Sequence, residues 1–167
     1  MSVSIDDALK AFIESGVSVS VGTCDSDLLP ALARAWGPHV GGDRRSLSLC
    51  ISPAASGKTL HNLQDNGKVA VTFSLPTSYK TAQIKGHSIE TTEPTAEDLA
   101  AVERHRETFI STTGAIGVSR DVVQLYVRRE LLSSPVLAKI VIIPEQIFDQ
   151  TPGPGAGSPL ITSAAAS

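Results

Sequence analysis

The sequence carries no excess of basic residues, since 14 Lys and Arg residues stand against 17 Asp and Glu residues and the net charge is −3. Nucleic-acid backbones are bound through basic surfaces, so this balance argues against a nucleic-acid-binding protein. No apolar run is long enough to cross a membrane. Residues 1–7 lack the basic region and the apolar core of a secretion signal, and we therefore expect a cytoplasmic protein that is not attached to a membrane.

Metal-ligating and nucleophilic patterns are also lacking. Cys24 and Cys50 are the only cysteines and have no metal-site spacing, which favours two reduced thiols over a disulfide. The four histidines show no ligand spacing, so we predict no metal site. No Ser-His-Asp or paired-carboxylate arrangement can be argued, which leaves hydrolytic chemistry without support.

The length of 167 residues and the hydrophobic content of 41% favour one globular domain. We expect this domain to span residues 1–150. Residues 151–167 are rich in Gly, Pro, Ser and Ala and cannot pack a core. We therefore predict a partly flexible C-terminal tail whose last few residues are mobile.

Apolar and polar residues alternate over several short stretches, which is typical of half-buried strands. Such strands are predicted at 17–21, 29–40, 46–51, 69–73, 81–92 and 136–143. Helices are predicted to begin at Ser4, at Thr59 and at Thr95, the last with a capping box to Asp98, whereas residues 122–127 suit a helix or a strand. Links of hairpin length between most strands favour a mainly β protein, an antiparallel barrel with peripheral helices.

Two strands carry further signals. In 29–40 the alternation sets Leu32, Arg34 and Trp36 on one face and three alanines on the other. In 81–92 a glycine, Gly86, lies in the middle of the strand. Glycine at such a position predicts a bulge or a close approach of another backbone.

The most informative stretch is 52–59, Ser-Pro-Ala-Ala-Ser-Gly-Lys-Thr, which follows an apolar strand and precedes a short helical pattern. Small residues let a backbone approach a ligand closely, and the N–H groups at a helix start favour an anion. Lys58 adds a positive charge, and Ser52, Ser56 and Thr59 add hydroxyl donors. This stretch therefore predicts a phosphate site.

Two phosphate ligands compete for this site. Gly57-Lys58-Thr59 matches the end of the P-loop pattern of nucleotide hydrolases, although Ser52 replaces the first glycine. The following helix has room for only about two turns before the next strand at Lys68, whereas a parallel crossover needs about a dozen residues or more. These mismatches weigh against the P-loop, and the competing ligand is the phosphate tail of a flavin.

Residues 5–150 resemble the pyridoxamine 5′-phosphate oxidase-like proteins, the FMN-binding split barrels. The family pattern combines an Arg on one strand, a strand ending near a hydroxyl residue, a Ser-x-Lys loop, a short helix with an Asn- or Asp-containing end, and a strand closing on Gly. The matching pieces here are Arg34, Ser52, 56–58, 62–66, 69–71 and 83–86. The resemblance implies an antiparallel Greek-key split β-barrel that binds FMN.

The same resemblance implies the roles of individual residues. Arg34, Lys58 and Ser56 would hold the FMN phosphate through charge-assisted hydrogen bonds, with Gly57 and Thr59 completing the loop. Gln83 would hydrogen-bond a carbonyl of the flavin ring, although Thr81, on the same face of its strand, could serve instead. Residues expected to line the ring are Ala35, Trp36, Ile51 and Ser52, with a core or dimer-interface role for Trp36 as an equal alternative.

Members of the family are usually homodimers with the flavin between subunits. The oxidase itself has a Lys where this chain has His39, and its substrate contacts in the later helix appear here as Arg106, Ile110 and Gly114. The pyridoxal phosphate site is thus largely missing. We therefore expect an FMN-dependent oxidoreductase with an undefined substrate and NAD(P)H as a possible electron donor. The alternative is a flavin- or heme-binding carrier or sensor without turnover.

Overall fold

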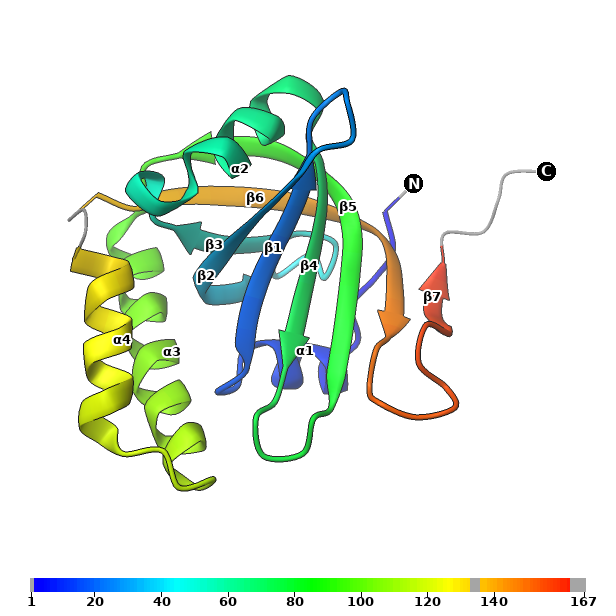
Figure 1. Ribbon diagram of the computed structural model, residues 1–167. Helices are drawn as coiled ribbons and strands as arrows, with labels where there is room; N and C mark the ends of the chain where they lie inside the picture. Colours follow the sequence, from blue (N-terminus) through cyan, green and yellow to red (C-terminus); the bar gives the residue numbers. More distant parts are fainter. Residues whose placement is uncertain (1, 133–135, 163–167) are drawn as a thin grey trace.

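Six antiparallel strands close into a barrel in the computed structural model, which describes residues 2–132 and 136–162 (Figure 1). The strands are β1 (Ser18–Cys24), β2 (Pro30–Val40), β3 (Leu47–Ile51), β4 (Lys68–Ser74), β5 (Thr81–Thr92) and β6 (Ala138–Asp149). Their order is β3-β2-β1-β4-β5-β6, and pairing of β3 with β6 closes the barrel. In the Greek-key arrangement a fourth strand returns beside the first of three consecutive strands, as β4 does here beside β1. The expected mainly β barrel with peripheral helices is confirmed.

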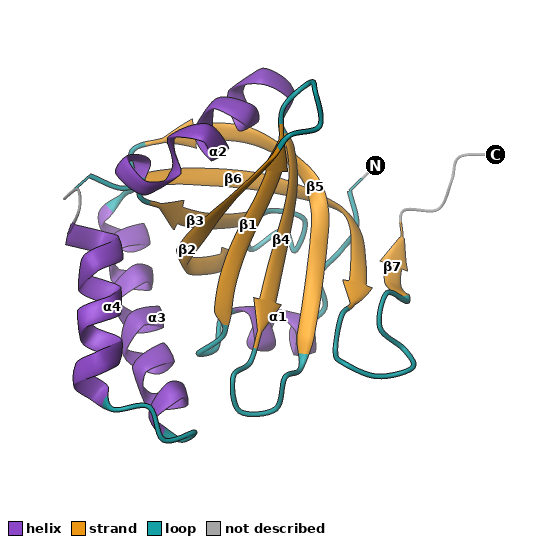
Figure 2. Cartoon of the chain, in the orientation of Figure 1, coloured by secondary structure: helices purple, strands orange, loops and turns teal. Residues whose placement is uncertain are grey.

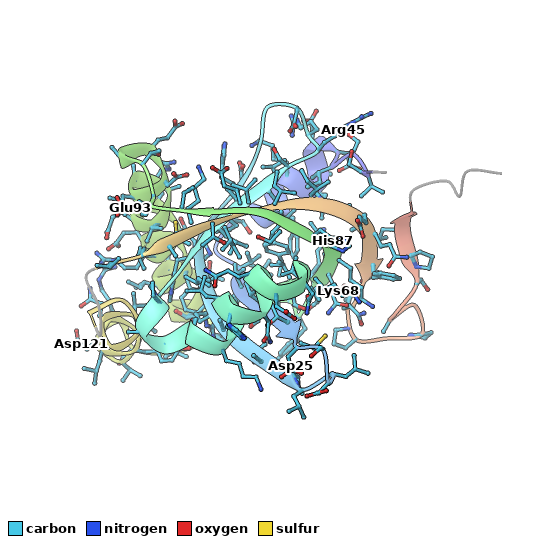
Figure 3. All side chains as sticks on the ribbon, turned by 90° about the horizontal axis from the view of Figure 1, so that it is seen from above. Asp25, Arg45, Lys68, His87, Glu93 and Asp121 are labelled. Atoms are coloured by element: carbon cyan, nitrogen blue, oxygen red, sulfur yellow. The ribbon has the colours of Figure 1, made fainter. Side chains whose placement is uncertain are left out.

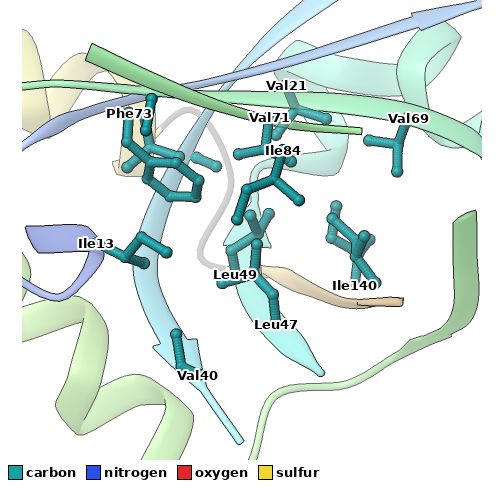
Figure 4. Close-up of a cluster of buried hydrophobic side chains, with 14 of the residues drawn as sticks. Ile13, Val21, Val40, Leu47, Leu49, Val69, Val71, Phe73, Ile84 and Ile140 are labelled. Atoms are coloured by element: carbon teal, nitrogen blue, oxygen red, sulfur yellow. The ribbon is translucent and has the colours of Figure 1, made fainter. Parts of the chain in front are cut away.

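The barrel interior is filled by the apolar residues of each alternating strand (Figure 4). In β1 and β4, buried and half-buried residues alternate without exception after the first position of β4. Removing each such Val, Leu, Ile or Phe side chain from water contributes about 1.5–3 kcal/mol. Side chains with no exposed surface include Val19, Val21, Ala35, Leu47, Ile51, Val71, Phe73, Ile84, Ile140 and Ile142.

Gly86 lies where β5 and β6 cross most closely. A Cβ atom at this position would lie 2.0 Å from the carbonyl oxygen of Ile143. The register between β5 and β6 also shifts between Lys85 and Gly86. The predicted bulge and close approach are therefore both confirmed, and this irregularity accompanies the bend of the two long strands around the barrel (Figure 1).

Helices cover the ends and one side of the barrel (Figure 2). Helix α1 (Asp7–Ile13) closes one end with Phe12 and Ile13. Its N-cap is Asp6, which accepts from the N–H of Leu9, so the prediction that the helix begins at Ser4 is wrong by two residues. Asp6 supplies a carboxylate at the cap position itself, which Ser4 cannot do from its place two residues earlier.

Helices α3 (Ala96–Gly114) and α4 (Arg120–Leu132) form a hairpin beside β2. The predicted capping box is confirmed, since Thr95 and Asp98 bond to each other's backbone N–H groups. The segment 122–127, left open between helix and strand, is helical. A second apolar cluster joins this hairpin to the barrel wall through Trp36, Cys50, Val102, Phe109, Ile110, Val123 and Val127. Within the described residues, no helix is both long and apolar enough to span a membrane.

Helix α2 (Pro53–Asn66) caps the other end of the barrel and begins six residues before the predicted start at Thr59. Ser52 is the N-cap residue and Pro53 occupies the first turn, where its missing N–H is harmless. The helix is kinked at Ser56, whose φ of −131° and ψ of 24° are not helical. The P-loop alternative is wrong, because residues 53–59 belong to the kinked helix α2 and the neighbours of β3 among the described strands, β2 and β6, are both antiparallel to it.

Strand β6 continues through Pro144 to Asp149, so the predicted end at residue 143 is wrong. Pro144 lies opposite Gly86 at the register shift, where a missing backbone N–H is tolerated. The chain then turns back and forms β7 (Pro159–Thr162), which pairs with β6. The expectation of mobility at the very end of the chain concerns residues 163–167, which lie outside the described residues.

Candidate functional site

The outer face of β1, β4 and β5 forms a floor of small polar side chains, because each of these strands turns every second residue away from the barrel core. Cross-strand neighbours on this floor bond to one another: Gln83 Nε2 donates to Thr72 Oγ1 at 3.1 Å, and the hydroxyls of Ser74 and Thr81 are 2.8 Å apart. We name this face the polar floor. Its members are Ser18, Ser20, Thr72, Ser74, Thr81 and Gln83, all half-buried.

Arg34 stands at the β2 edge of the polar floor. Its Nη1 donates to Ser18 Oγ at 2.5 Å. The guanidinium carbon lies 5.9 Å from the ring centre of Phe109 and 5.5 Å from that of Tyr126, distances at which a cation and an aromatic face attract each other. The α3–α4 hairpin and β1 therefore both position this cation.

A cavity of about 250 Å³ opens beside Arg34. The kink in α2 contributes Ser56 to its wall, and β1 contributes Ser20. Arg34 and Ser56, predicted from sequence to share a phosphate, are thus brought to one cavity. The remaining lining residues are Leu32, Ala33, Ala55 and Tyr126.

Lys58 does not line this cavity. Its Nζ lies 3.3 Å from Asp25 Oδ2 in the β1–β2 turn, and its side chain is 51% exposed. The pKa of Asp25 is lowered first by the hydrogen bond from the N–H of Leu29 and further by Lys58. The two predicted phosphate cations are therefore oriented differently: Arg34 lines the cavity, whereas Lys58 extends from α2 to Asp25 in the β1–β2 turn.

Other residues predicted to contact the cofactor lie deeper. Ala35 and Ile51 are fully buried with side chains in the barrel core. Trp36 is 2% exposed and packs edge-on against His105 and Phe109, which is the core role left open from the sequence. Ser52 and Thr59 are buried, and Gly57 is exposed on α2; the buried Ser52 Oγ has no hydrogen-bond partner among the described residues.

Several residues of the site were not identified from sequence. Ser18 and Ser20 belong to an alternating strand, and only the position of Arg34 beside them shows that they face a cavity. Tyr126 could not be found, because its segment was ambiguous between helix and strand. His105 is buried behind the site: burial lowers its pKa to about 4, partly opposed by its hydrogen bond to the carbonyl of Val17, while Arg34 lowers it further.

Solved structures share this fold. An F420 reductase is 13% identical with a TM-score of 0.57 over 86% of this chain and 98% of that one. An FMN-binding protein from Syntrophomonas wolfei is 13% identical with a TM-score of 0.54, over 83% and 81% of the two chains. A candidate pyridoxamine 5′-phosphate oxidase from Lactobacillus delbrueckii is 13% identical with a TM-score of 0.52, over 87% and 93%.

These likenesses confirm the expected split-barrel fold, which the chain shares with proteins described as pyridoxamine 5′-phosphate oxidase-like and FMN-binding. Neither a scan against protein-family models nor a search of curated sequences finds a match. At 13% identity these likenesses establish the fold of this chain and not its ligand.

Proposed function

We propose that this chain is an FMN-binding member of the pyridoxamine 5′-phosphate oxidase-like proteins and acts as a flavin-dependent oxidoreductase on a substrate other than pyridoxamine phosphate. The observation that carries the proposal is the joint presence of Arg34 and Ser56 in one cavity at the edge of the polar floor. The proposal is supported by the fold shared with an FMN-binding protein and with a reductase.

The cavity beside Arg34 has the chemistry of a phosphate monoester site. A guanidinium offers several N–H donors to an anion, and hydrogen bonds to a charged partner are about twice as strong as neutral ones. Hydroxyls of Ser20 and Ser56 add donors on two further sides. Because Ser18 and two aromatic rings already hold the guanidinium, little side-chain freedom would be lost when the phosphate binds.

Lys58 would join this site by leaving Asp25. An exposed ion pair of this kind stabilises the protein by about 1 kcal/mol or less, so a dianionic phosphate is the stronger partner for the lysine. Its side chain is long and half-exposed, so it can exchange one anionic partner for another. We therefore keep Lys58 as a phosphate residue, with a contribution smaller than that of Arg34.

The polar floor would receive the rest of the flavin. Gln83 and Thr81 both face outward there and can bond to ring carbonyls or ribityl hydroxyls, while the backbone near Ala35, Trp36, Ile51 and Ser52 would border the ring. When bound, FMN supplies the hydride or electron chemistry, and the protein supplies binding and orientation. An obvious catalytic acid or base is therefore not required.

A second copy of the chain would complete the site. Large apolar side chains are exposed on the β1–β2 hairpin and on α4, and Leu32 of this hairpin lines the cavity beside Arg34. Contiguous exposed apolar surface marks an interaction site more often than solitary residues do. The residues concerned are Leu28, Leu29, Leu32, Val122 and Leu125, with Leu32 74% exposed. We propose a homodimer through this surface, which is tested by the mass in solution of the wild type and of Leu32→Glu.

Flavin titration tests the proposed cofactor. Quenching of flavin fluorescence should show FMN binding, and Arg34→Ala should weaken it about 10- to 100-fold, because a hydrogen bond to a charged group contributes about 1.5–3 kcal/mol. Lys58→Ala should have a smaller effect in the same direction. Neither substitution should change riboflavin binding, since riboflavin lacks the phosphate. Arg45→Ala, an exposed cation in the β2–β3 loop, is the matched control.

Equal losses for FMN and riboflavin would contradict the assignment of Arg34. Anaerobic mixing of the FMN complex with NADH or NADPH tests the oxidoreductase: loss of flavin absorbance supports turnover. Stable FMN binding without reduction by any donor would favour the carrier alternative.

A further inference from the structure

A groove of about 650 Å³ runs along the outer face of the barrel next to the polar floor. It exists because two small residues, Gly22 and Ala70, are direct cross-strand partners on β1 and β4. The larger Leu32 pairs with Gly22 on one side, and Lys85 pairs with Ala70 on the other. A row of large, small, small and large side chains leaves a hollow between the two walls. The groove is lined by Gly22, Thr23, Cys24, Pro30, Ala31, Leu32, Lys68, Val69, Ala70, Lys85, Gly86, His87 and Glu145.

Positive charge predominates at the rim of this groove. Lys68 and His87 are cross-strand neighbours there, and Figure 3 labels them close together. Glu145 supplies the one carboxylate, and its Oε1 is occupied by His87 Nδ1 at 2.7 Å. Among the residues that the structure describes, Lys68 and Lys85 make no ion pair; Lys85 Nζ lies 4.8 Å from the ring centre of Phe148. Two ammonium groups that pair with no carboxylate among the described residues therefore border an apolar hollow.

We propose that this groove binds a small organic acid with an apolar body that is ionised at neutral pH. Such an acid is the substrate that exchanges electrons with the bound flavin. The apolar floor takes the body of the molecule, and Lys68 and Lys85 take its anionic group. Ligand sites of this size are typically apolar with a few polar groups that fix orientation. Leu32 lines both this groove and the cavity beside Arg34, so the two sites adjoin. Only the role as substrate rests on the proposed flavin function; the binding itself does not.

A pair of fluorescent probes tests the binding. Anilinonaphthalene sulfonate is an apolar anion, and phenylnaphthylamine is its neutral counterpart. The flavin-free protein should bind the anion, and Lys68→Gln and Lys85→Gln should each weaken it about threefold to fivefold, the range of an exposed ion pair. Binding of the neutral probe should not change. Arg45→Gln removes a charge far from the groove and should leave both probes unaffected (Figure 3).

Filling the hollow gives a second variant. Ala70→Leu places a larger side chain on the outward face of β4, where folding does not require a small residue, and should abolish binding of both probes. Equal binding of the two probes by the wild type would overturn the charge assignment. Unchanged binding by Ala70→Leu would overturn the location.

Cys24 reports on the groove independently of fluorescence. It is a half-buried thiol in the groove wall, whereas Cys50 is buried, and burial raises the pKa of its thiol to about 11. Iodoacetamide should therefore alkylate Cys24 first, as measured by mass spectrometry, and the anionic probe should slow this reaction. An unchanged rate at saturating probe would overturn the proposal.

The same variants separate this proposal from the flavin function. Arg34→Ala should weaken FMN binding and leave the anionic probe unaffected, whereas Lys68→Gln should weaken binding of the anionic probe and leave FMN binding unaffected. A wild type that ignores FMN but binds the anion with protection of Cys24 contradicts the flavin function and supports the groove. A wild type that binds FMN but no apolar anion contradicts the groove alone.

Discussion

Mild acid should destabilise this protein through one buried imidazole, that of His105. Its Nδ1 accepts from the N–H of Gly37 at 3.3 Å, and its Nε2 lies 2.9 Å from the carbonyl oxygen of Val17. Both ring nitrogens are therefore used by the neutral form, with Nε2 as the donor. A second proton on Nδ1 would face the Gly37 N–H and would bury a charge close to the Arg34 guanidinium.

The size of the effect follows from the pKa of His105. Burial lowers it from 6.5 to about 4 in the folded state, so the unfolded chain takes up the proton first as the pH falls. The stability that neutral His105 contributes is fully present at pH values above the pKa of the unfolded chain. It is lost progressively as the pH falls from 6.5 to about 4. At 1.36 kcal/mol for each pH unit the whole loss is about 3 kcal/mol, of which about 2 kcal/mol falls between about pH 7 and about pH 5.

Urea unfolding at a series of pH values measures this loss. In the wild type the free energy of unfolding should fall by about 2 kcal/mol between about pH 7 and about pH 5. His105→Gln keeps a donor and an acceptor but cannot be protonated, so this part of the pH dependence should disappear whatever the stability of the variant at neutral pH. His61→Gln, at an exposed position of α2, should retain it. An unchanged pH dependence in His105→Gln would refute the assignment.

Two further predictions concern the scaffold. Gly86→Ala should lower the free energy of unfolding by about 3 kcal/mol, because the new Cβ would meet the backbone oxygen of Ile143. Gly42→Ala, which has open space around it, is the control and should change stability by about 0.5 kcal/mol or less. Equal effects of the two substitutions would contradict the close approach at Gly86. Thr95→Ala should lower the free energy of unfolding by about 1 kcal/mol, because it removes the side-chain cap of α3. Thr95→Ser keeps the hydroxyl and should retain most of that stability. An unchanged urea midpoint in Thr95→Ala would show that the cap is dispensable.

The strands could be predicted because their interior and exterior residues alternate strictly, as in β1 and β4. Alternation fails as a guide where a strand crosses proline, which is why β6 was ended before Pro144 although a bulge accommodates that residue. Strand β7 follows a Gly- and Pro-rich turn and pairs with β6. Nothing in four residues of sequence predicts a partner that is set by tertiary structure.

Within the site, the sequence indicates which residues could bind a phosphate better than it indicates where their side chains point. Arg34 and Ser56 line one cavity, and strand alternation places the arginine on the outer face of the sheet. Lys58, two residues after Ser56, points to Asp25 instead, and that pairing depends on where the β1–β2 turn folds over α2. The start of α2 was signalled by Pro53 after a serine, a typical first-turn pattern that the resemblance to a phosphate loop obscured.

The closing strand β6 has a consequence for how the chain reaches its native state. Strands β1 to β5 lie in the first 92 residues, but the barrel closes only when β6 pairs with both β3 and β5. During synthesis the two edges of a five-stranded sheet thus stay unpaired until residues 138–149 have been made. Closure also pairs Leu47 with Ile142, and contacts between residues far apart in the sequence slow folding. Between the completion of β5 and the synthesis of β6 the nascent protein therefore has exposed sheet edges that can pair with other chains.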